Sequence, residues 1–270
     1  MCHVIDLIQY NDLPEWYQDN NLITEGYRAP NPNYNELINS IFSLHNETAN
    51  IWSHIAGVVL FIVLAIYYGT SDLMPIYRLL IIGYCVLVIF AFSLSIVYHT
   101  CNCHSQEINY KCITLDYLGI IFLIFGKSCL LIYVIFYQNI NMRIIYCAIS
   151  GLLLLVLYIS TQQPDFYSSN SRPYRVLLYG MNCLYILIPL IHGGIESCDK
   201  KYIIILTSFL IMVGFYLIGI IFYVKRFPEN ICQNKIINYI GHSHNWWHLF
   251  TILGALTHLI GMVQVIRLIE

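Results

Sequence analysis

The 270-residue sequence predicts an all-α membrane protein, a bundle of seven transmembrane helices. Hydrophobic residues make up 58% of the chain and charged residues only 10%. Apolar runs of about 20 residues recur along it, and a helix of that length spans a bilayer core of roughly 30 Å. Helices suit lipid because they satisfy their own backbone hydrogen bonds. The net charge of −2, without a cluster of basic residues, excludes nucleic acid as a partner.

Seven apolar runs are predicted to span the membrane. In chain order they cover residues 50–69, 76–98, 114–137, 142–161, 174–194, 202–224 and 246–267. The connecting segments are short, so consecutive helices must run in opposite directions and pack into one bundle.

The chain divides into a polar N-terminal segment, residues 1–48, and a transmembrane domain, residues 49–270. The segment before the first apolar run is rich in acidic residues, so we expect no signal peptide and a cytosolic location for it. Seven Lys and Arg residues lie on the N-terminal side of the predicted spans and five on the other side. The positive-inside rule therefore favours a cytosolic N-terminus and an external C-terminus. The membrane is expected to be the plasma membrane, the Golgi or another endomembrane.

The ten cysteines do not indicate a disulfide framework, because several lie inside apolar runs, where they act as small hydrophobic residues. Cys101, Cys103 and Cys112 share a short region with His104. This pattern could bind a metal, but free thiols are the preferred interpretation.

Three histidines lie at the ends of two spans that are far apart in sequence. His99 follows the second span, and His244 and His248 adjoin the start of the seventh. Alternating helices place all three on the N-terminal side of the membrane. His244 and His248 are one helical turn apart, about 40° around the axis and about 6 Å along it, so they can face a common point. Three imidazoles with an open fourth position form a known type of catalytic zinc site. From spacing alone, metal binding and ordinary interfacial histidines remain equal alternatives.

Ser95 and Asp116 are predicted to lie at the same level as the three histidines. Ser95 is one turn before His99, and Asp116 is near the start of the third span. A carboxylate at this depth needs a positive or protic partner. A water molecule bound to zinc would provide one.

Several stretches resemble the progestin and adipoQ receptor family, which includes the adiponectin receptors and is related to haemolysin III. They are HNETANIWSH (45–54), SIVYHTCNCHS (95–105) with LDY (115–117), GHSHNWWH (241–248), GYR (26–28) and KRFPE (225–229). The resemblance implies a seven-helix bundle with a cytosolic N-terminus and one Zn²⁺ near the cytosolic face. It assigns His99, His244 and His248 as the zinc ligands. It assigns Asp116 as the acidic residue that holds the metal-bound water and Ser95 as the nearby serine. It leaves His242 and His258 outside the ligand set.

The family is also similar to alkaline ceramidases, which share the Ser, Asp and three-His arrangement. This implies a zinc-dependent amidohydrolase that cleaves ceramide-like membrane lipids into a fatty acid and a sphingoid base. Zinc held by three neutral imidazoles lowers the pKa of a bound water and polarises a carbonyl group. Asp116 would take the proton from the water and pass it to the leaving amine. Ser95 would donate a hydrogen bond to the water or to the developing oxyanion.

Two non-catalytic functions remain open. The protein could be a receptor for an external hormone or lipid, with a structural zinc. Its N-terminal segment could instead be a docking platform for a cytosolic signalling partner, because NETANIWSH (46–54) and NYIGHSHNWWH (238–248) resemble the Golgi-resident family member that tethers Raf kinase.

Two further features receive structural interpretations. The residues before the first span, His45, Asn46, Glu47 and Asn50, are expected to serve in capping and lid packing rather than in catalysis. Asn46 or Thr48 would cap the helix, and Glu47 would favour its positive end. Lys127 lies within the third span, where a charge is costly. It is either a neutral lysine hydrogen-bonded to carbonyl groups or a ligand for a lipid headgroup.

Overall fold

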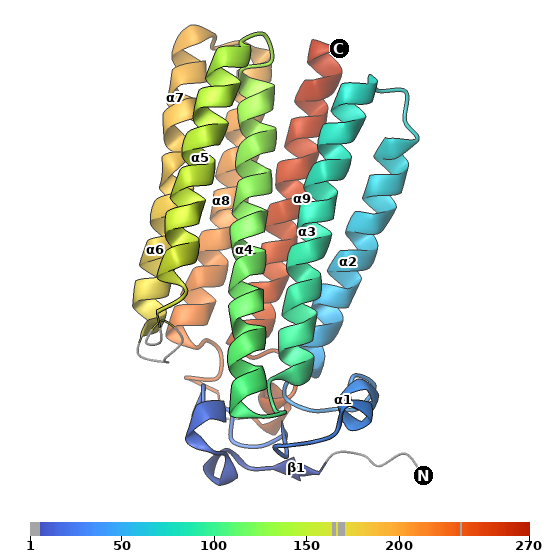
Figure 1. The fold of residues 1–270 in the computed structure, drawn as a ribbon, viewed down its shortest axis with the longest axis vertical. Coiled ribbons are helices and arrows are strands. Elements are labelled where there is room, and N and C mark those ends of the chain that lie inside the picture. The colour runs from blue at the N-terminus through green and yellow to red at the C-terminus, as the bar shows by residue number, and fades with distance from the viewer. Residues whose placement is uncertain (1–5, 164–165, 167–170, 233) are drawn as a thin grey trace.

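The seven predicted membrane helices are present in the computed structural model, which describes residues 6–163, 166, 171–232 and 234–270. They lie side by side in one bundle (Figure 1). Their bounds are α2 Thr48–Gly69, α3 Pro75–Cys101, α4 Gln106–Ile135, α5 Ile140–Ser160, α6 Arg172–Tyr185 with α7 Leu187–Glu196, α8 Lys200–Lys225 and α9 Ser243–Ile269. The helices α6 and α7 follow each other and form one span, Pro173–Glu196.

The largest difference from the predicted spans is at the start of α4. This helix begins at Gln106, eight residues before the predicted start at residue 114. Ser105 caps it by accepting a hydrogen bond from the backbone N–H of Ile108. The first two turns are polar, so a search for apolar runs misses them, although the cap is a good sequence signal for a helix start.

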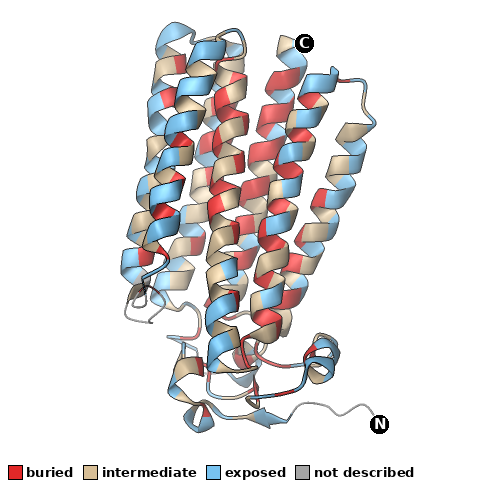
Figure 2. Ribbon diagram, in the orientation of Figure 1, coloured by how far each residue is buried: buried red, intermediate tan, exposed pale blue. Residues whose placement is uncertain are grey.

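The helices α3, α4 and α9 form the centre of the bundle and carry most of its buried residues (Figure 2). Helices α3 and α4 approach closely where a glycine allows it. A Cβ atom added to Gly119 would lie 3.0 Å from the main chain of Ala91. This close approach sets α4 directly against the half of α3 that leads to His99.

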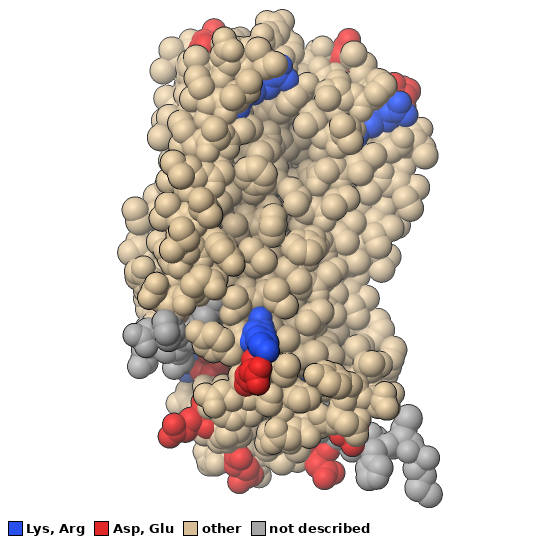
Figure 3. All heavy atoms as spheres, viewed as in Figure 1, with Lys and Arg blue, Asp and Glu red and all other residues tan. Residues whose placement is uncertain are grey.

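The outer faces of the helices are apolar, as expected for contact with lipid. Large hydrophobic side chains such as Val63, Leu152 and Leu217 are exposed there. On the face drawn in Figure 3, the charged side chains lie toward the two ends and the middle band has none. The chain is therefore an integral, multi-pass membrane protein. The predicted orientation of its termini and its compartment stay predictions.

The N-terminal segment folds against one end of the bundle (Figure 1). Its strands, β1 (Leu7–Ile8) and β2 (Tyr27–Arg28), pair antiparallel, and the short helix α1 (Tyr34–Ser40) follows. The segment shares a small hydrophobic core with the loop after α3. This core consists of Leu13, Tyr17, Ile23, Tyr27 and Leu37 of the segment and Cys103 of the loop. The predicted division of the chain after residue 48 stays a prediction.

Arg28 connects this segment to the end of α3. Its side chain is fully buried. It donates hydrogen bonds to the carbonyl oxygens of His99 (2.6 Å) and Thr100 (2.9 Å), and to the side-chain oxygens of Ser40 and Asn102 (both 2.9 Å). The last carbonyl groups of a helix have no partner within the helix. Arg28 provides those partners, and so fixes the position of the turn that carries His99.

Candidate metal centre

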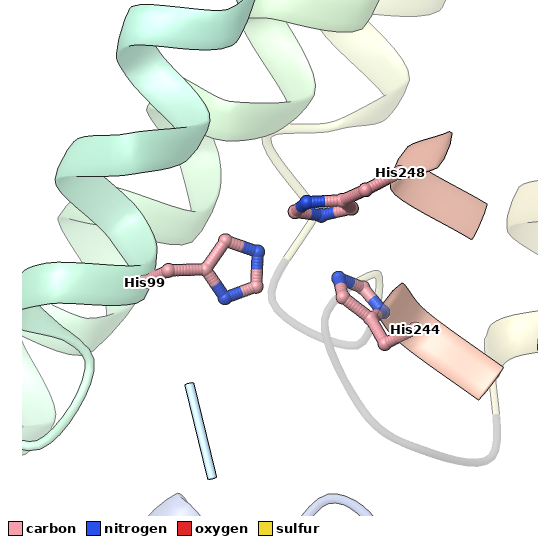
Figure 4. Close-up of side chains that lie close together, drawn as sticks. All are labelled: His99, His244 and His248. Carbon is pink, nitrogen blue, oxygen red and sulfur yellow. The ribbon is translucent and has the colours of Figure 1, made fainter. Parts of the chain in front are cut away.

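The three histidines singled out by the sequence come together at one end of the bundle. Figure 4 shows the ring of His99, from α3, pointing toward the rings of His244 and His248, from α9. Ligand-capable atoms of the three residues all lie within 4.8 Å of one another. His99 and His248 are buried, and His244 is half-buried. The group could hold a metal ion.

The hydrogen bonding of these rings fits a metal. Within the described part of the chain, the Nε2 atoms of His99 and His244 are buried and have no hydrogen-bond partner. An unpaired buried nitrogen is unfavourable, and a metal that accepts both lone pairs removes that cost. The Nδ1 atom of His248 lies 3.2 Å from the carbonyl oxygen of Asn50. A proton on Nδ1 would satisfy this contact and leave the Nε2 lone pair free for the metal.

Glu47 orients His99 from behind. Its carboxylate oxygen Oε2 lies 2.8 Å from His99 Nδ1. The same carboxylate accepts hydrogen bonds from Asn102 Nδ2 (2.9 Å) and Asn50 Nδ2 (2.6 Å). A carboxylate on the outer nitrogen of a histidine keeps the inner nitrogen unprotonated and raises its basicity toward a metal. Glu47 therefore completes a carboxylate–histidine pair that points into the centre.

The pKa of the Glu47 carboxyl group is consistent with an ionised Glu47 as the partner of His99. Burial alone would raise this pKa, but the electrostatic interaction with the His99 ring and the hydrogen bonds from His99 and Asn50 hold it well below its usual range. Glu47 occupies the N-cap position of α2, at the positive end of the helix as expected, and its side chain makes no capping hydrogen bond. The carboxylate turns inward because three buried polar groups there need an acceptor.

His54 is a further residue that sequence reasoning did not single out. Its ring stacks on that of His248, with centroids 3.7 Å apart and planes 7° apart. It comes from α2, two turns after Glu47. Glu47, Asn50 and His54 are spaced i, i+3 and i+7, which places them on one face of a helix. This spacing is visible in the sequence and could have predicted that the three side chains face the site together.

The other histidines lie outside the group of three. His242 Nε2 lies 3.1 Å from the carbonyl oxygen of Asn46. His258 is deeper in the bundle, with its ring centroid 5.3 Å from that of Tyr84. Of the alternative cysteine site, Cys103 is buried in the small hydrophobic core beside the N-terminal segment and the ring of His104 stacks on Tyr34. The metal-capable group found among the described residues consists of the three histidines.

Ser95 and Asp116 lie in the wall of the same cavity as the three histidines. Ser95 is buried on α3, and its hydroxyl group interacts with the Asp116 carboxyl group on α4. Asp116 is not a member of the group that could hold the metal. The structure thus brings together the five residues that the sequence indicated, while the catalytic roles of Ser95 and Asp116 stay predictions.

The cavity is large enough for a lipid chain. Its volume is about 1150 Å³, and it extends from the three histidines into the middle of the bundle, where apolar residues of α3, α4, α6 and α8 line it. Residues of the N-terminal segment, among them Trp16 and Asp19, also line it. A long apolar chain and a polar reacting group could occupy it together.

These features define a class of protein: a seven-helix membrane protein with three histidines converging at one end of the bundle. Residues 42–259 match the model of the haemolysin-III related family. The chain therefore belongs to this family, as the resemblance of its sequence motifs predicted.

Named relatives agree with this assignment. Over 98% of its length the chain is 30% identical to the adiponectin receptor protein of Drosophila melanogaster. It is 32% identical over 96% of its length to progestin and adipoQ receptor-like protein 1 of Caenorhabditis elegans. It is 30% identical over 92% of its length to human progestin and adipoQ receptor family member 3. The chain spans 59% and 61% of the first two relatives and 82% of the third.

Proposed function

We propose that this protein is a zinc-dependent hydrolase of ceramide-like lipid amides. The observation that carries the proposal is that three converging imidazoles, a carboxylic acid outside the ligand group and a lipid-sized apolar space share one cavity. A metal site with three histidines has room for a substrate in the fourth position. The membrane location makes a lipid the natural substrate.

Zinc suits the donor set because imidazole nitrogens are among its preferred ligands. When bound, zinc would polarise the amide carbonyl and make water more acidic. His99, His244 and His248 would hold it, and Glu47 would keep His99 in the required tautomer.

Asp116 and Ser95 would carry out the proton transfers. The Asp116 carboxylate accepts a proton from the attacking water, and a C–O bond forms at the amide carbon. Asp116 then gives this proton to the amine nitrogen as the C–N bond breaks. The Ser95 hydroxyl keeps the carboxyl group oriented and can donate a hydrogen bond to the oxyanion. The products are a fatty acid and a sphingoid base, which balances the atoms of the amide and one water.

The test is fatty-acid release from ceramide by purified, zinc-loaded protein. Asp116→Asn should keep the metal and lose about 100-fold or more of the turnover, the usual contribution of a general acid–base. Asp199→Asn is the matched control, because Asp199 is a partly exposed N-cap residue of α8 outside the cavity and asparagine caps equally well. The proposal fails if the zinc-loaded wild type leaves ceramide intact, or if Asp116→Asn retains full turnover.

A receptor function is the second candidate, because the relatives are named as receptors or as members of a receptor family. In that case zinc would hold α3 and α9 together without catalysing a reaction. Hormone- or lipid-induced signalling that survives Asp116→Asn would favour the receptor. Loss of both signalling and turnover would favour the enzyme. The cytosolic N-terminus and its use as a docking platform for a signalling partner remain predictions.

A further inference from the structure

Three large apolar side chains in and after α1 are exposed at the end of the bundle that holds the three histidines. The exposed fractions of Ile38, Phe42 and Leu44 are 57%, 77% and 58%. Ile38 belongs to α1, and the other two belong to the turn between α1 and α2. Figure 1 shows α1 to one side of the bundle, below the end of α2. We call these three side chains the α1 patch. They face the outside of the protein, so the proposed reaction does not use them.

Trp52 joins the α1 patch to the lipid-facing surface of α2. The ring of Phe42 packs edge-on against that of Trp52, with centroids 6.0 Å apart. Trp52 Nε1 donates a hydrogen bond to the carbonyl oxygen of Ile41 at 2.9 Å. Trp52 also begins a stripe of exposed apolar residues along α2, which continues with Ala56, Val59, Val63 and Ile66. Steps of three and four residues keep this stripe on one face of the helix. The α1 patch therefore extends a surface that contacts lipid.

The length of α2 fixes the depth of Trp52 in the membrane. The helix has 22 residues. At 1.5 Å per residue it is about 33 Å long, close to the bilayer core of roughly 30 Å. Its two ends therefore lie at the two boundaries of the core, and Trp52, in the second turn, lies just inside one of them. Tryptophan is typical of this boundary. Phe42, which packs against Trp52, is at the level of the lipid headgroups.

Leu44 is held at the same level by the first residue of α2. The Thr48 hydroxyl group donates a hydrogen bond to the carbonyl oxygen of Ser43 and accepts one from the backbone N–H of His45, both at 2.8 Å. Leu44 lies between these two residues in the chain. Its backbone is thus fixed next to the end of α2, where the bilayer core ends.

The sequence around the α1 patch favours apolar insertion over attraction by charge. Glu36 is the only charged residue between residues 29 and 46. Its carboxylate accepts a hydrogen bond from the backbone N–H of Asn33 in the capping box of α1. The exposed polar neighbours Asn35 and Asn39 are uncharged. Without Lys or Arg this stretch has no attraction to anionic lipids, so buried apolar area has to supply the membrane contact.

We propose that the α1 patch inserts into the headgroup region of the surrounding bilayer leaflet, at the boundary with the acyl chains. The lipid that fits it is a zwitterionic phospholipid such as phosphatidylcholine. Insertion would hold α1 in place, and Ser40 of α1 shares the side chain of Arg28 with the carbonyl oxygen of His99. The membrane surface thereby supports the turn that carries His99. The contact requires neither a bound metal nor turnover, so it does not depend on the proposed hydrolysis.

The experiment is photocrosslinking to lipid. Phe42→p-benzoylphenylalanine is introduced into the full-length protein, which is purified into phosphatidylcholine nanodiscs and irradiated. The excited benzophenone bonds to a nearby C–H group, so mass spectrometry of the intact chain detects lipid adducts. Leu7 is the matched control position, because it is an exposed apolar residue of β1, which lies farther from the membrane helices than α1 (Figure 1). Val63, on the lipid-facing stripe, is the positive reference.

The yield of phosphatidylcholine adducts at Phe42 should exceed that at Leu7 about tenfold or more, the preference that burial of one large apolar side chain gives. A yield no greater than at Leu7 would overturn the proposal. Crosslinks from Phe42 to a second copy of the chain or to another protein, when the variant is irradiated in cell membranes, would also overturn it. If the Phe42 variant fails to fold, Leu44→p-benzoylphenylalanine takes its place under the same criteria.

The lipid composition tests the mode of binding. Replacing part of the phosphatidylcholine with phosphatidylserine should leave the total lipid-adduct yield at Phe42 unchanged, because the stretch around the α1 patch has no basic residue. A yield that rises with phosphatidylserine and falls again at high salt would show binding by charge, and would overturn apolar insertion.

Discussion

The contact between Glu47 and His99 gives a quantitative prediction for metal affinity. In Glu47→Gln, one carboxylate oxygen becomes an amide NH₂ group. The wild-type carboxylate accepts from His99 and Asn50 at Oε2 and from Asn102 at Oε1. Whichever way the glutamine turns, its NH₂ group faces another donor, and the negative charge next to His99 is lost.

The loss can be estimated from these contacts. Removing one hydrogen bond to a charged group costs about 1.5–3 kcal/mol, and changes to such supporting residues typically weaken metal binding about 10- to 100-fold. We therefore expect Glu47→Gln to bind zinc about 10- to 100-fold more weakly than the wild type. The assay is competition with a chromogenic zinc chelator, on purified protein whose fold is checked by thermal unfolding.

Glu107→Gln is the control for this experiment. It makes the same chemical change at an exposed residue whose partner is Lys111, and it should leave zinc affinity unchanged. A folded Glu47→Gln protein with wild-type zinc affinity would refute the role assigned to the carboxylate.

Three further predictions concern stability. Burial, with the charge of Arg28, lowers the pKa of His45 to about 3, and an unfolded histidine titrates near pH 6.5. Because the unfolded chain binds the proton at a higher pH than the folded protein, the free energy of unfolding falls by about 2 kcal/mol between pH 7 and pH 5. His45→Gln should flatten this part of a pH profile of thermal unfolding. A profile with the wild-type slope would contradict this prediction. Arg28→Met should cost more than about 3 kcal/mol in chemical unfolding, because it leaves buried carbonyl groups unpaired, whereas Arg267→Met, at an exposed position, should cost little. Gly119→Ala should destabilise the bundle by about 1–3 kcal/mol because its Cβ meets the main chain of α3 at 3.0 Å. Gly214→Ala is the control and should not destabilise it, because a Cβ atom there has nothing within 4 Å. Equal unfolding temperatures for the two variants would refute the packing argument.

The transmembrane helices could be predicted because bilayer thickness sets their length and apolar composition. The alternation of helix direction and the helical repeat were enough to bring His99, His244 and His248 to one end. The polar first turns of α4 escaped prediction because hydropathy detects only the part of a helix that lies in lipid. Their capping residue, Ser105, was the available signal.

The supporting residues of the site were harder to predict. Glu47 was assigned only to the positive end of a helix, because acidic side chains favour helix N-termini. Its contact with His99 depends on how α2 is rotated about its axis, and that is set by packing against α3 and α9 rather than by local sequence. The same holds for His54, whose stacking on His248 joins α2 to α9. The surroundings of Lys127 depended in the same way on packing, since its Nζ atom on α4 lies over a tyrosine ring of α8.

The central claim is that the three imidazoles bind one zinc ion, and metal analysis of the purified protein tests it most directly. After zinc loading and removal of loosely bound metal, mass spectrometry should find one zinc per wild-type chain. A folded His248→Ala variant should retain very little, because two of the three ligands cannot hold the ion tightly. A folded wild-type protein without zinc, or a His248→Ala protein with one zinc per chain, would contradict the account.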